Sequence, residues 1–185
     1  MKQQKLTFLF TVLMSVIGTS AFAHSFEVAN DDGVTIYYKK TSQTTVAISC
    51  RGTYSSDYKN EYTGNVVIPE SVTYDGKTYS VTAIDNDTFE NCSGLTSVSI
   101  PNSVTSIGSC AFDGCSGLTS VTIPNSVSSI ENATFQDCSS LNFVKIGNSV
   151  TSIDAYAFAG CSGLSSITIP KSVSSINSYA FYRCI

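Results

Sequence analysis

The sequence is poor in charged side chains and in basic residues above all. Charged residues make up 13% of the 185 residues, about half the share of a typical globular protein. Of the 10 basic residues, Lys2 and Lys5 lie in the first stretch; without them 8 remain against 14 acidic ones, a net charge of −6. This balance argues against nucleic-acid binding, which needs basic patches.

The chain has one histidine, His24, and this argues against a catalytic centre. A Ser or Cys nucleophile usually needs a base, and we expect His24 to be a flexible remnant beside the mature amino terminus. No Cys or His residues cluster at the short spacing of a zinc site, and "NDDG" (30–33) has too few spaced carboxylates for a calcium loop. We therefore expect no catalytic residues, no metal and no cofactor.

The first 23 residues have the pattern of a secretory signal. A positive start, "MKQQK", precedes the apolar run "LTFLFTVLMSVIG" and the small-residue end "TSAFA", which places Ala21 and Ala23 for cleavage. The apolar run is shorter than the roughly 20 residues that span a bilayer, and no cysteine follows Ala23 to carry an acyl anchor. We predict a signal peptide at 1–23 and a secreted or cell-surface mature chain that begins at His24.

The rest of the chain repeats itself every 23 residues. Seven sets of equivalent residues, here called columns, recur at this interval without an insertion; six are apolar and one is cysteine. A period of 20 to 29 residues with a Leu-x-x-Leu-x-Leu core predicts a leucine-rich-repeat solenoid. The columns are Cys92, Cys115, Cys138, Cys161 and Cys184; Leu95, Leu118, Leu141 and Leu164; Val98, Val121, Val144 and Ile167; Ile100, Ile123, Ile146 and Ile169; Val104, Val127, Val150 and Val173; Ile107, Ile130, Ile153 and Ile176; and Phe112, Phe135, Phe158 and Phe181.

Each repeat predicts one main strand followed by a return path. In "LTSVSI" (95–100) the apolar residues of the strand core alternate, as in a half-buried strand. Proline ends the strand, because it has no N–H to donate, and all four prolines of the chain follow an isoleucine at this place: Pro69, Pro101, Pro124 and Pro170. A single repeat cannot bury its apolar edge, so the stack is the folding unit. We predict a mainly β solenoid of 23-residue rungs, with a parallel sheet on one face and little regular helix.

The chain before the repeats differs in composition and predicts a small β-rich cap at 24–64. "FEV", "VTIYY" and "TVAIS" are typical of short strands, and Asp75-Gly76 predicts a hairpin turn inside a disguised first repeat. Residues 65–185 then form the solenoid, which we expect to be incomplete at its carboxyl end because "FYRCI" stops just inside a new repeat. Either the sequence is a fragment of a longer protein or a partner covers that end.

The motifs "IPNSVTSIGSCAF" and "CSGLTSV" resemble the BspA-like leucine-rich-repeat family of bacterial surface proteins over about residues 66–185. The resemblance implies a role in adhesion, with host matrix or plasma proteins or other bacterial surface proteins as partners. It is specific for the fold and only weakly specific for the function.

The 23-spaced cysteines predict a reduced, packed column rather than disulfides. Parallel Cβ vectors on stacked repeats aim the sulfurs poorly for a bridge, and cysteine is a favoured small buried residue. Cys110, whose equivalents are Ala133, Tyr156 and Tyr179, and Cys50 in the cap lie outside this column. We expect these two to be the accessible thiols.

The outward positions of the strands give the candidate partner-binding residues. Three repeats present hydroxyls only, whereas the third carries an aromatic ring and a cation, with Gly147 in place of proline. Aromatic residues often dominate binding energy, although a lone exposed phenyl ring is also ordinary surface. The candidates are Thr96, Ser97, Ser99, Thr119, Ser120, Thr122, Asn142, Phe143, Lys145, Ser165, Ser166 and Thr168.

The predicted sheet is small for a protein interface. Five strands of about six residues give roughly 480 Å², against about 800 Å² per partner in a stable complex. Either loops and the tyrosine-rich segment 53–64 contribute, or affinity comes from many copies. We expect an exported, non-enzymatic, adhesin-like interaction module. The alternative is a structural spacer or a glycan-binding surface repeat without a specific protein partner.

Overall fold

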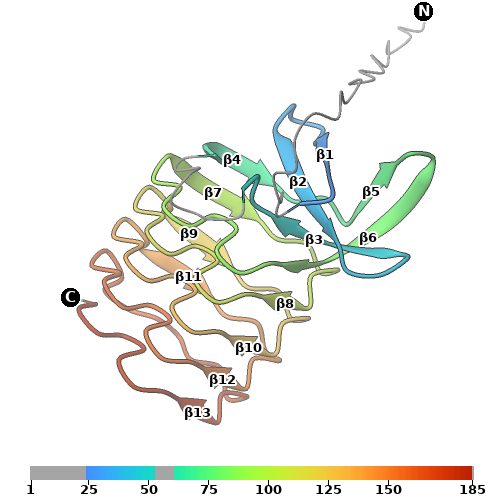
Figure 1. The fold of residues 1–185 in the computed structure, drawn as a ribbon. Coiled ribbons are helices and arrows are strands. Elements are labelled where there is room, and N and C mark those ends of the chain that lie inside the picture. The colour runs from blue at the N-terminus through green and yellow to red at the C-terminus, as the bar shows by residue number, and fades with distance from the viewer. Residues whose placement is uncertain (1–23, 53–60, 185) are drawn as a thin grey trace, which may run out of the picture.

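The structure is a computed structural model that describes residues 24–52 and 61–184. This part of the chain contains thirteen β-strands and no helix (Figure 1). The strands are β1 (Phe26–Ala29), β2 (Thr35–Lys40), β3 (Thr45–Ser49), β4 (Gly64–Val67), β5 (Ser71–Tyr74), β6 (Lys77–Ile84), β7 (Leu95–Ser99), β8 (Ser106–Ile107), β9 (Ser120–Thr122), β10 (Ser129–Ile130), β11 (Phe143–Lys145), β12 (Ser152–Ile153) and β13 (Ser175–Ile176).

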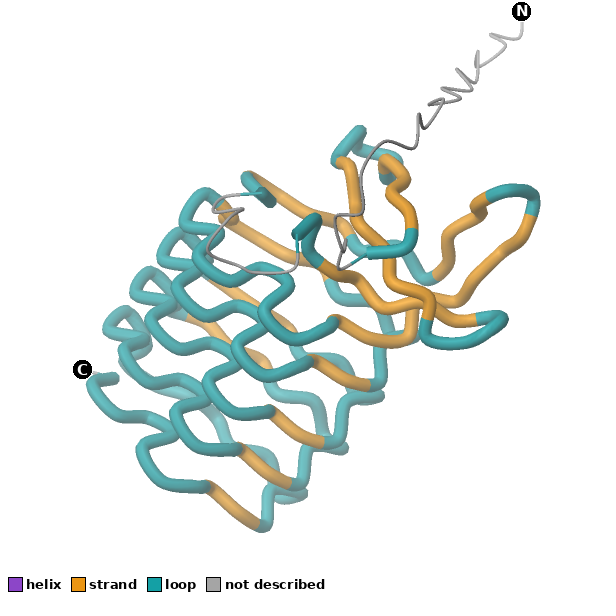
Figure 2. The backbone as a smooth tube through the Cα atoms, viewed as in Figure 1, coloured by secondary structure: helices purple, strands orange, loops and turns teal. Residues whose placement is uncertain are grey.

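Successive repeats lay their strands side by side in parallel on two sides of the molecule (Figure 2). One sheet has the order β11-β9-β7-β4, and it pairs Ser97 with Ser120 and Ser120 with Phe143. On the other side β8 pairs with β6, and β10, β12 and β13 pair in order. The predicted parallel sheet is confirmed. The second set of paired strands was not predicted, because two-residue strands leave no alternating pattern in the sequence.

Hydroxyl side chains link the repeats to one another, which explains why serine and threonine fill the positions between the apolar columns. The Oγ1 atoms of Thr119 and Thr151 donate to backbone oxygens of Thr96 and Ser128, 3.3 and 3.1 Å away and 23 positions earlier. Ser174 makes the equivalent bond to Thr151, at 3.1 Å. The backbone N–H groups of the same residues also donate to these oxygens, so each hydroxyl adds a second hydrogen bond to a carbonyl group of the preceding repeat.

A column of stacked phenylalanine rings runs through the core. Neighbouring ring centroids of Phe89, Phe112, Phe135, Phe158 and Phe181 lie 4.9 to 5.4 Å apart, with interplanar angles of 4 to 8°. Four of these rings are fully buried, and Phe181 is half-buried. Most other members of the predicted apolar columns are buried as well. The exceptions are Ile100, which is half-buried, and the members in the last repeat after Leu164, where Ile176 is 50% exposed because no described strand covers β13.

The 23-spaced cysteines line the core beside this column, and all seven cysteines of the chain are free thiols. Four of the 23-spaced thiols donate to the phenylalanine carbonyl oxygen 26 positions earlier: Cys115 to Phe89 at 3.0 Å, Cys138 to Phe112 at 3.1 Å, Cys161 to Phe135 at 3.1 Å and Cys184 to Phe158 at 3.0 Å. Burial raises the pKa of these thiols, that of Cys161 to about 12. They stay protonated as hydrogen-bond donors in the fold.

The cysteine column predicts a pattern of thiol reactivity. In the native protein at pH 8 the buried thiols of Cys92, Cys115, Cys138 and Cys161 should not react with a thiol reagent, whereas all seven should react after denaturation without reductant. Fewer than seven thiols in the denatured protein would reveal a bridge and contradict the packed column. Because burial raises the folded-state pKa values of Cys115, Cys138 and Cys161, the stability that these three thiols contribute is present below about pH 9 and is lost at higher pH, as the unfolded thiols ionise.

The cap is continuous with the repeats rather than separate from them. Its sheet has the order β1-β2-β3-β6-β5, and β8 of the second repeat pairs with β6. The turn between β5 and β6 has φ values of 50° at Asp75 and 70° at Gly76, as expected for the predicted hairpin. The sheet therefore takes strands from both sides of residue 64, and the division at 64/65 stays a prediction.

Tyr62 joins the cap to the phenylalanine column. Its buried ring lies 4.6 Å from the ring of Phe89 and so continues the column by one aromatic residue. Its hydroxyl group donates to the backbone oxygen of Ser49 (2.9 Å) and accepts from the backbone N–H of Tyr37 (3.2 Å). One side chain thus contacts the repeats and satisfies two backbone groups of the cap.

His24 is packed, so the prediction of a flexible remnant is wrong. Its side chain is 6% exposed, its Nδ1 atom lies 3.1 Å from the backbone oxygen of Arg51, and its ring meets Tyr37 edge-on at 4.9 Å. The sequence could not show this, because the contact partners are 13 and 27 positions away. The amino-terminal end of the described chain is held against the cap.

Candidate binding surface

The candidate surface is the outer face of the sheet β11-β9-β7-β4. Alternation along these strands turns Val98, Val121 and Val144 into the core and the residues on either side of them outward. All twelve predicted residues have accessible side chains: Ser97 and Ser120 are half-buried, and the other ten are exposed. The structure brings nine of them together on β7, β9 and β11 or at the starts of these strands.

The last predicted strand of this face does not form. Ser165, Ser166 and Thr168 are exposed, but the segment 164–170 has no strand assignment and β11 is the edge of the sheet. Its place is taken at the opposite edge by β4, which pairs Asn65 with Ser97 and Val67 with Ser99. Sequence reasoning missed Asn65 and Val67 because the hairpin β5–β6 shifts this repeat: 97 − 65 is 32, nine more than 23. The shared "IP" after the strand was the signal that could have found them.

Phe143 and Lys145 stand out from this surface. Phe143 is 56% exposed, and Lys145 is exposed two residues further along β11. Their equivalents on the neighbouring strand are Ser120 and Thr122. The ring therefore projects from a sheet that otherwise presents hydroxyl and amide groups and the partly exposed Val67 (37%).

Gly147 lets this irregular repeat approach its neighbour closely. A Cβ atom at Gly147 would lie 2.5 Å from the backbone oxygen of Pro124 and 2.9 Å from that of Ile123. The repeat is held there by a hydrogen bond from the backbone N–H of Ile123 to the oxygen of Lys145 (2.9 Å) and by one from Asn148 N to Asn125 Oδ1 (2.8 Å). The substitution of glycine for proline thus has a packing reason, separate from the exposed pair.

The tyrosine-rich segment contributes less than its composition suggests. Tyr62 is fully buried, and residues 53–60, like the predicted signal peptide 1–23, lie outside the described residues. A shallow groove of about 290 Å³ adjoins β4 and is lined by Asn30, Asp31, Asp32 and Val67 among others. It continues the surface beyond β4 toward the turn between β1 and β2.

The thiols outside the core column are also poor nucleophiles. Burial, with the carboxylates of Asp87 and Asp113 nearby, raises the pKa of Cys110 to about 11. Burial and the carboxylate of Glu61 also raise the pKa of Cys50. Both thiols are protonated near neutral pH, whereas thiol chemistry requires the thiolate. Within residues 24–52 and 61–184, no group of three His, Cys, Asp or Glu side chains could hold a metal ion.

Asp113 is half-buried beside other acidic side chains. Burial raises its pKa to about 6, and the carboxylates of Asp137, Glu90 and Asp87 add to the shift. A raised folded-state pKa means that the stabilising contribution of the neutral acid is complete below about pH 4 and is lost as the pH rises through 6.

Asp113→Asn is therefore expected to stabilise the protein at pH 7 but not at pH 4. The gain at pH 7 should be about 1 kcal/mol, because solvent screens this half-exposed group. Urea unfolding at the two pH values measures it. The exposed Asp31→Asn is the control and should change the unfolding free energy by less than about 0.5 kcal/mol at either pH. An equal gain at pH 4 and pH 7 would contradict the electrostatic cause.

Comparison with known proteins agrees with this architecture. The model of the BspA type leucine rich repeat region matches residues 54–185 in six copies. The chain belongs to this family. The repeats of the family generally form a non-enzymatic protein-interaction fold in bacteria, and BspA-type proteins are typically surface-exposed or secreted. The leucine-rich-repeat fold predicted from the 23-residue period is thereby confirmed.

Solved structures of bacterial leucine-rich-repeat proteins resemble the chain over most of its length. A protein from Bacteroides ovatus is 35% identical, with a TM-score of 0.71, over 80% of this chain and 37% of its own. The T. pallidum leucine-rich-repeat protein is 29% identical, with a TM-score of 0.67, over 80% of this chain and 64% of its own. The chain thus spans less than two thirds of either. The pneumococcal vaccine antigen PcpA, 18% identical with a TM-score of 0.56, shares the fold over 86% of this chain and 48% of its own. No curated protein matches the chain.

No helix within the described ranges is long and apolar enough to cross a membrane.

Proposed function

We propose that this BspA-type protein is exported by cleavage near Ala23 and acts as an adhesin-like module that binds host or bacterial macromolecules. The binding surface is the outer face of the sheet β11-β9-β7-β4. The observation that carries the proposal is the 56% exposure of Phe143 beside Lys145, next to strands β7 and β9, which present hydroxyls. An exposed ring adds nothing to the core of the fold, whereas aromatic residues at the centre of an interface often supply much of its binding energy.

The repeats supply the scaffold for this surface. We propose that they form a solenoid of 23-residue rungs over 65–185, with the residues 24–64 as its amino-terminal cap. The 23-position step of the paired residues in both sets of parallel strands supports this arrangement. The contact between Tyr62 and Phe89 supports the role of the cap, because it covers the end of the phenylalanine column.

The surface is too small for a tight complex of one copy with one partner. Four strands of three to five residues at about 4.8 Å spacing give roughly 250 Å², against about 800 Å² for each side of a stable interface. We therefore propose that firm attachment requires neighbouring surfaces, such as the groove beside β4, or several copies that bind together.

A substitution to the consensus of the repeats tests the surface without disturbing the fold. Phe143→Ser combined with Lys145→Thr copies the side chains of Ser120 and Thr122. The secreted chain, expected to begin at His24, should bind at least one immobilised matrix or plasma protein, and the double variant should lose this binding at least about tenfold, as for a hot-spot residue. Surface plasmon resonance measures the affinities, and Ser152→Ala on the other set of strands is the control.

A structural spacer or a glycan-binding repeat is the second candidate, and the hydroxyl-covered strands β7 and β9 favour it. In that case the parent and the double variant behave alike towards every immobilised protein. The parent then retains either no ligand at all or only polysaccharides. Equal binding by the parent and the double variant would therefore overturn the proposed surface.

A further inference from the structure

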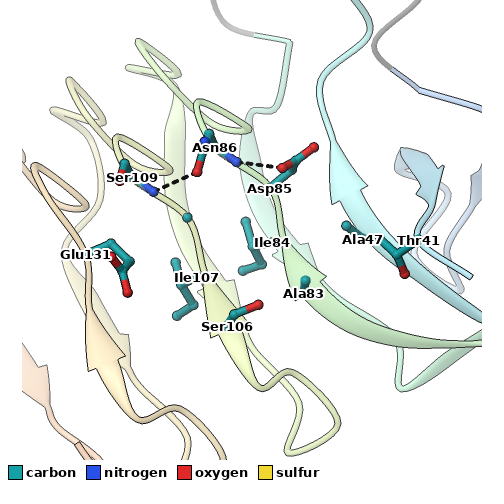
Figure 3. A pocket seen from close by; sticks show the side chains of 11 residues that line it. Thr41, Ala47, Ala83, Ile84, Asp85, Asn86, Ser106, Ile107, Ser109 and Glu131 are labelled. Carbon is teal, nitrogen blue, oxygen red and sulfur yellow. Dashed lines mark hydrogen bonds between the residues drawn. The ribbon is translucent and has the colours of Figure 1, made fainter. Parts of the chain in front are cut away.

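A second groove lies on the other set of parallel strands, away from the surface that carries Phe143. It has a volume of about 320 Å³ and lies where the cap meets the second and third repeats (Figure 3). Its lining combines small side chains, Ala47, Ala83 and Ser106, with two carboxylates, Asp85 and Glu131. In Figure 3 these two carboxylates lie on opposite sides of Ile107.

The groove exists because one repeat lacks a side chain. The outward column that begins at Asp85 continues with Gly108, Glu131, Asp154 and Asn177. Gly108 is required there, since a Cβ atom would lie 2.6 Å from the backbone nitrogen of Asn86 and would also overlap the Asn86 side chain. That side chain is fixed in turn, because its Oδ1 atom accepts from the backbone N–H of Ser109 at 3.0 Å. The gap between the two carboxylates is thus built into the packing.

The two carboxylates are not equivalent. Asp85 is already engaged: one oxygen accepts from the Lys39 ammonium group at 2.7 Å, and the other accepts from the backbone N–H of Asn86 at 3.1 Å. Glu131 accepts from the Ser129 hydroxyl through Oε1 (2.5 Å), and its Oε2 atom accepts from no group in the described ranges. On the Glu131 side of the groove, one carboxylate oxygen is therefore available to accept a hydrogen bond from a ligand.

The charge around the groove is negative overall. Asp85 and Glu131 line it, Asp154 stands one repeat beyond Glu131, and Lys39 is the one cation that contacts these acids within the described residues. Asp154 accepts an amide hydrogen bond from Asn177 through Oδ1 at 3.0 Å, and unlike Glu131 it does not line the groove. A cationic group is the complementary occupant.

The backbone beside the groove is also less constrained than elsewhere. β8 pairs with β6, and β10 pairs with β12, but β8 and β10 are not paired with each other in the described structure. All the other neighbours in this set of strands are hydrogen-bonded. This interruption lets the groove adjust its width without the loss of ladder hydrogen bonds.

We propose that the groove binds an arginine side chain carried by an extended segment of a partner protein. The walls are two repeats apart, about 10 Å between backbones, and a flat guanidinium group presents donors on more than one edge, so it can contact carboxylates on both walls. The guanidinium donates to Oε2 of Glu131 and shares Asp85 with Lys39, while its aliphatic stem lies over Ala83 and Ser106. A compact ammonium group reaches only one wall at a time.

Peptide titration of the whole secreted chain tests this site. The probe is a capped Gly-Ser-Arg-Ser-Gly peptide, and its control carries citrulline, which keeps the shape but loses the charge. In NMR spectra the arginine peptide should shift the amide signals of Gly108, Ser109 and Glu131, and the citrulline peptide should not. No shift at these signals with the arginine peptide at about 10 mM, or equal shifts with both peptides, would overturn the proposal.

Matched variants separate this groove from other acidic surfaces. Glu131→Gln should weaken binding of the arginine peptide about tenfold, the usual value of a hydrogen bond to a charged group, and Asp154→Asn should leave it unchanged. Ser106→Leu should fill the groove and abolish binding, whereas Ser152→Leu, two repeats further on, should not. Equal weakening by Glu131→Gln and Asp154→Asn would mean unspecific attraction to acids. Phe143→Ser with Lys145→Thr should leave this binding intact, so failure here and failure of the proposed sheet surface are told apart.

Discussion

Replacement of Phe135 by alanine is expected to lower the free energy of unfolding by about 3–5 kcal/mol. The ring is fully buried, and its neighbours Phe112 and Phe158 lie 5.2 and 5.3 Å away on its two sides. Its removal leaves a cavity in the middle of the column and breaks two stacked pairs, each worth about 0.5–1.5 kcal/mol beyond burial. Equilibrium urea unfolding of the parent and the variant measures the difference.

The matched control for Phe135 is Phe143, the one exposed phenylalanine among the residues that the structure describes. Phe143→Ala should change the free energy of unfolding by less than about 0.5 kcal/mol, because the ring is exposed on β11. If Phe135→Ala leaves too little folded protein to measure, Phe135→Leu should still unfold at lower urea than the parent. A loss below about 1 kcal/mol for Phe135→Ala would contradict the role of the column.

Tyr62→Ala is expected to cost a similar amount, about 3–5 kcal/mol, and to loosen the cap. The substitution removes the ring against Phe89 and the hydroxyl group that satisfies Ser49 and Tyr37. Tyr62→Phe separates the two effects: it keeps the ring, leaves two buried backbone groups unsatisfied and should cost about 1–3 kcal/mol. Urea unfolding together with amide hydrogen exchange in β2 and β3 measures both.

The hydrogen exchange distinguishes a local from a global effect. With Tyr62→Ala, the amide groups of β2 and β3 should exchange faster than those of β9 and β11, because the aromatic contact holds the cap sheet onto the repeats. Tyr156, which is 40% exposed in a later repeat and stacks on Tyr179, offers the comparison: Tyr156→Ala should leave exchange in β2 and β3 unchanged. Unchanged exchange in the Tyr62→Ala protein would refute the proposed role of the cap.

Much of the fold could be predicted because the repeats record it many times over. Each apolar column has four or five members at the same step, so a single departure does not hide the pattern. The positions of Leu118, Val121 and Phe135 in the core follow directly from the alternation and the period. The cysteine column was predicted for the same reason, although its hydrogen bonds to phenylalanine carbonyl groups were not.

The failures lie where the repeats end or are interrupted. β4 was displaced from the register by the hairpin β5–β6, and the segment 164–170 lacks strand structure although its sequence matches the others. Whether a segment pairs with the strand beside it depends on how the two lie in space, and the local sequence does not show this. His24 was misjudged likewise, because its burial depends on Tyr37 and Arg51, which are brought to it by the cap sheet.

The sequence was enough to locate Phe143 and Lys145 on the candidate surface, but not to find the groove on the other set of strands. Phe143 and Lys145 differ from the consensus of their columns, and both project outward as predicted. The groove between Asp85 and Glu131 could not be seen, because it depends on the absence of a side chain at Gly108 and on the contact of that residue with Asn86. The binding surface and the groove both contain residues that depart from the repeat. Only the structure shows which departures have a packing reason, such as Gly147, and which place a side chain on the surface, such as Phe143.

The most direct test of the binding surface is a hydroxyl-radical footprint of the secreted chain, alone and with the matrix or plasma protein that it retains. Phe143 is 56% exposed in the free chain and should be oxidised readily. With the partner bound, oxidation of Phe143 should fall at least about threefold, while that of Tyr74, on the hairpin, should stay the same. Protection of Tyr74 or Tyr156 with full oxidation of Phe143 would place the interface elsewhere and contradict the proposed function of the sheet.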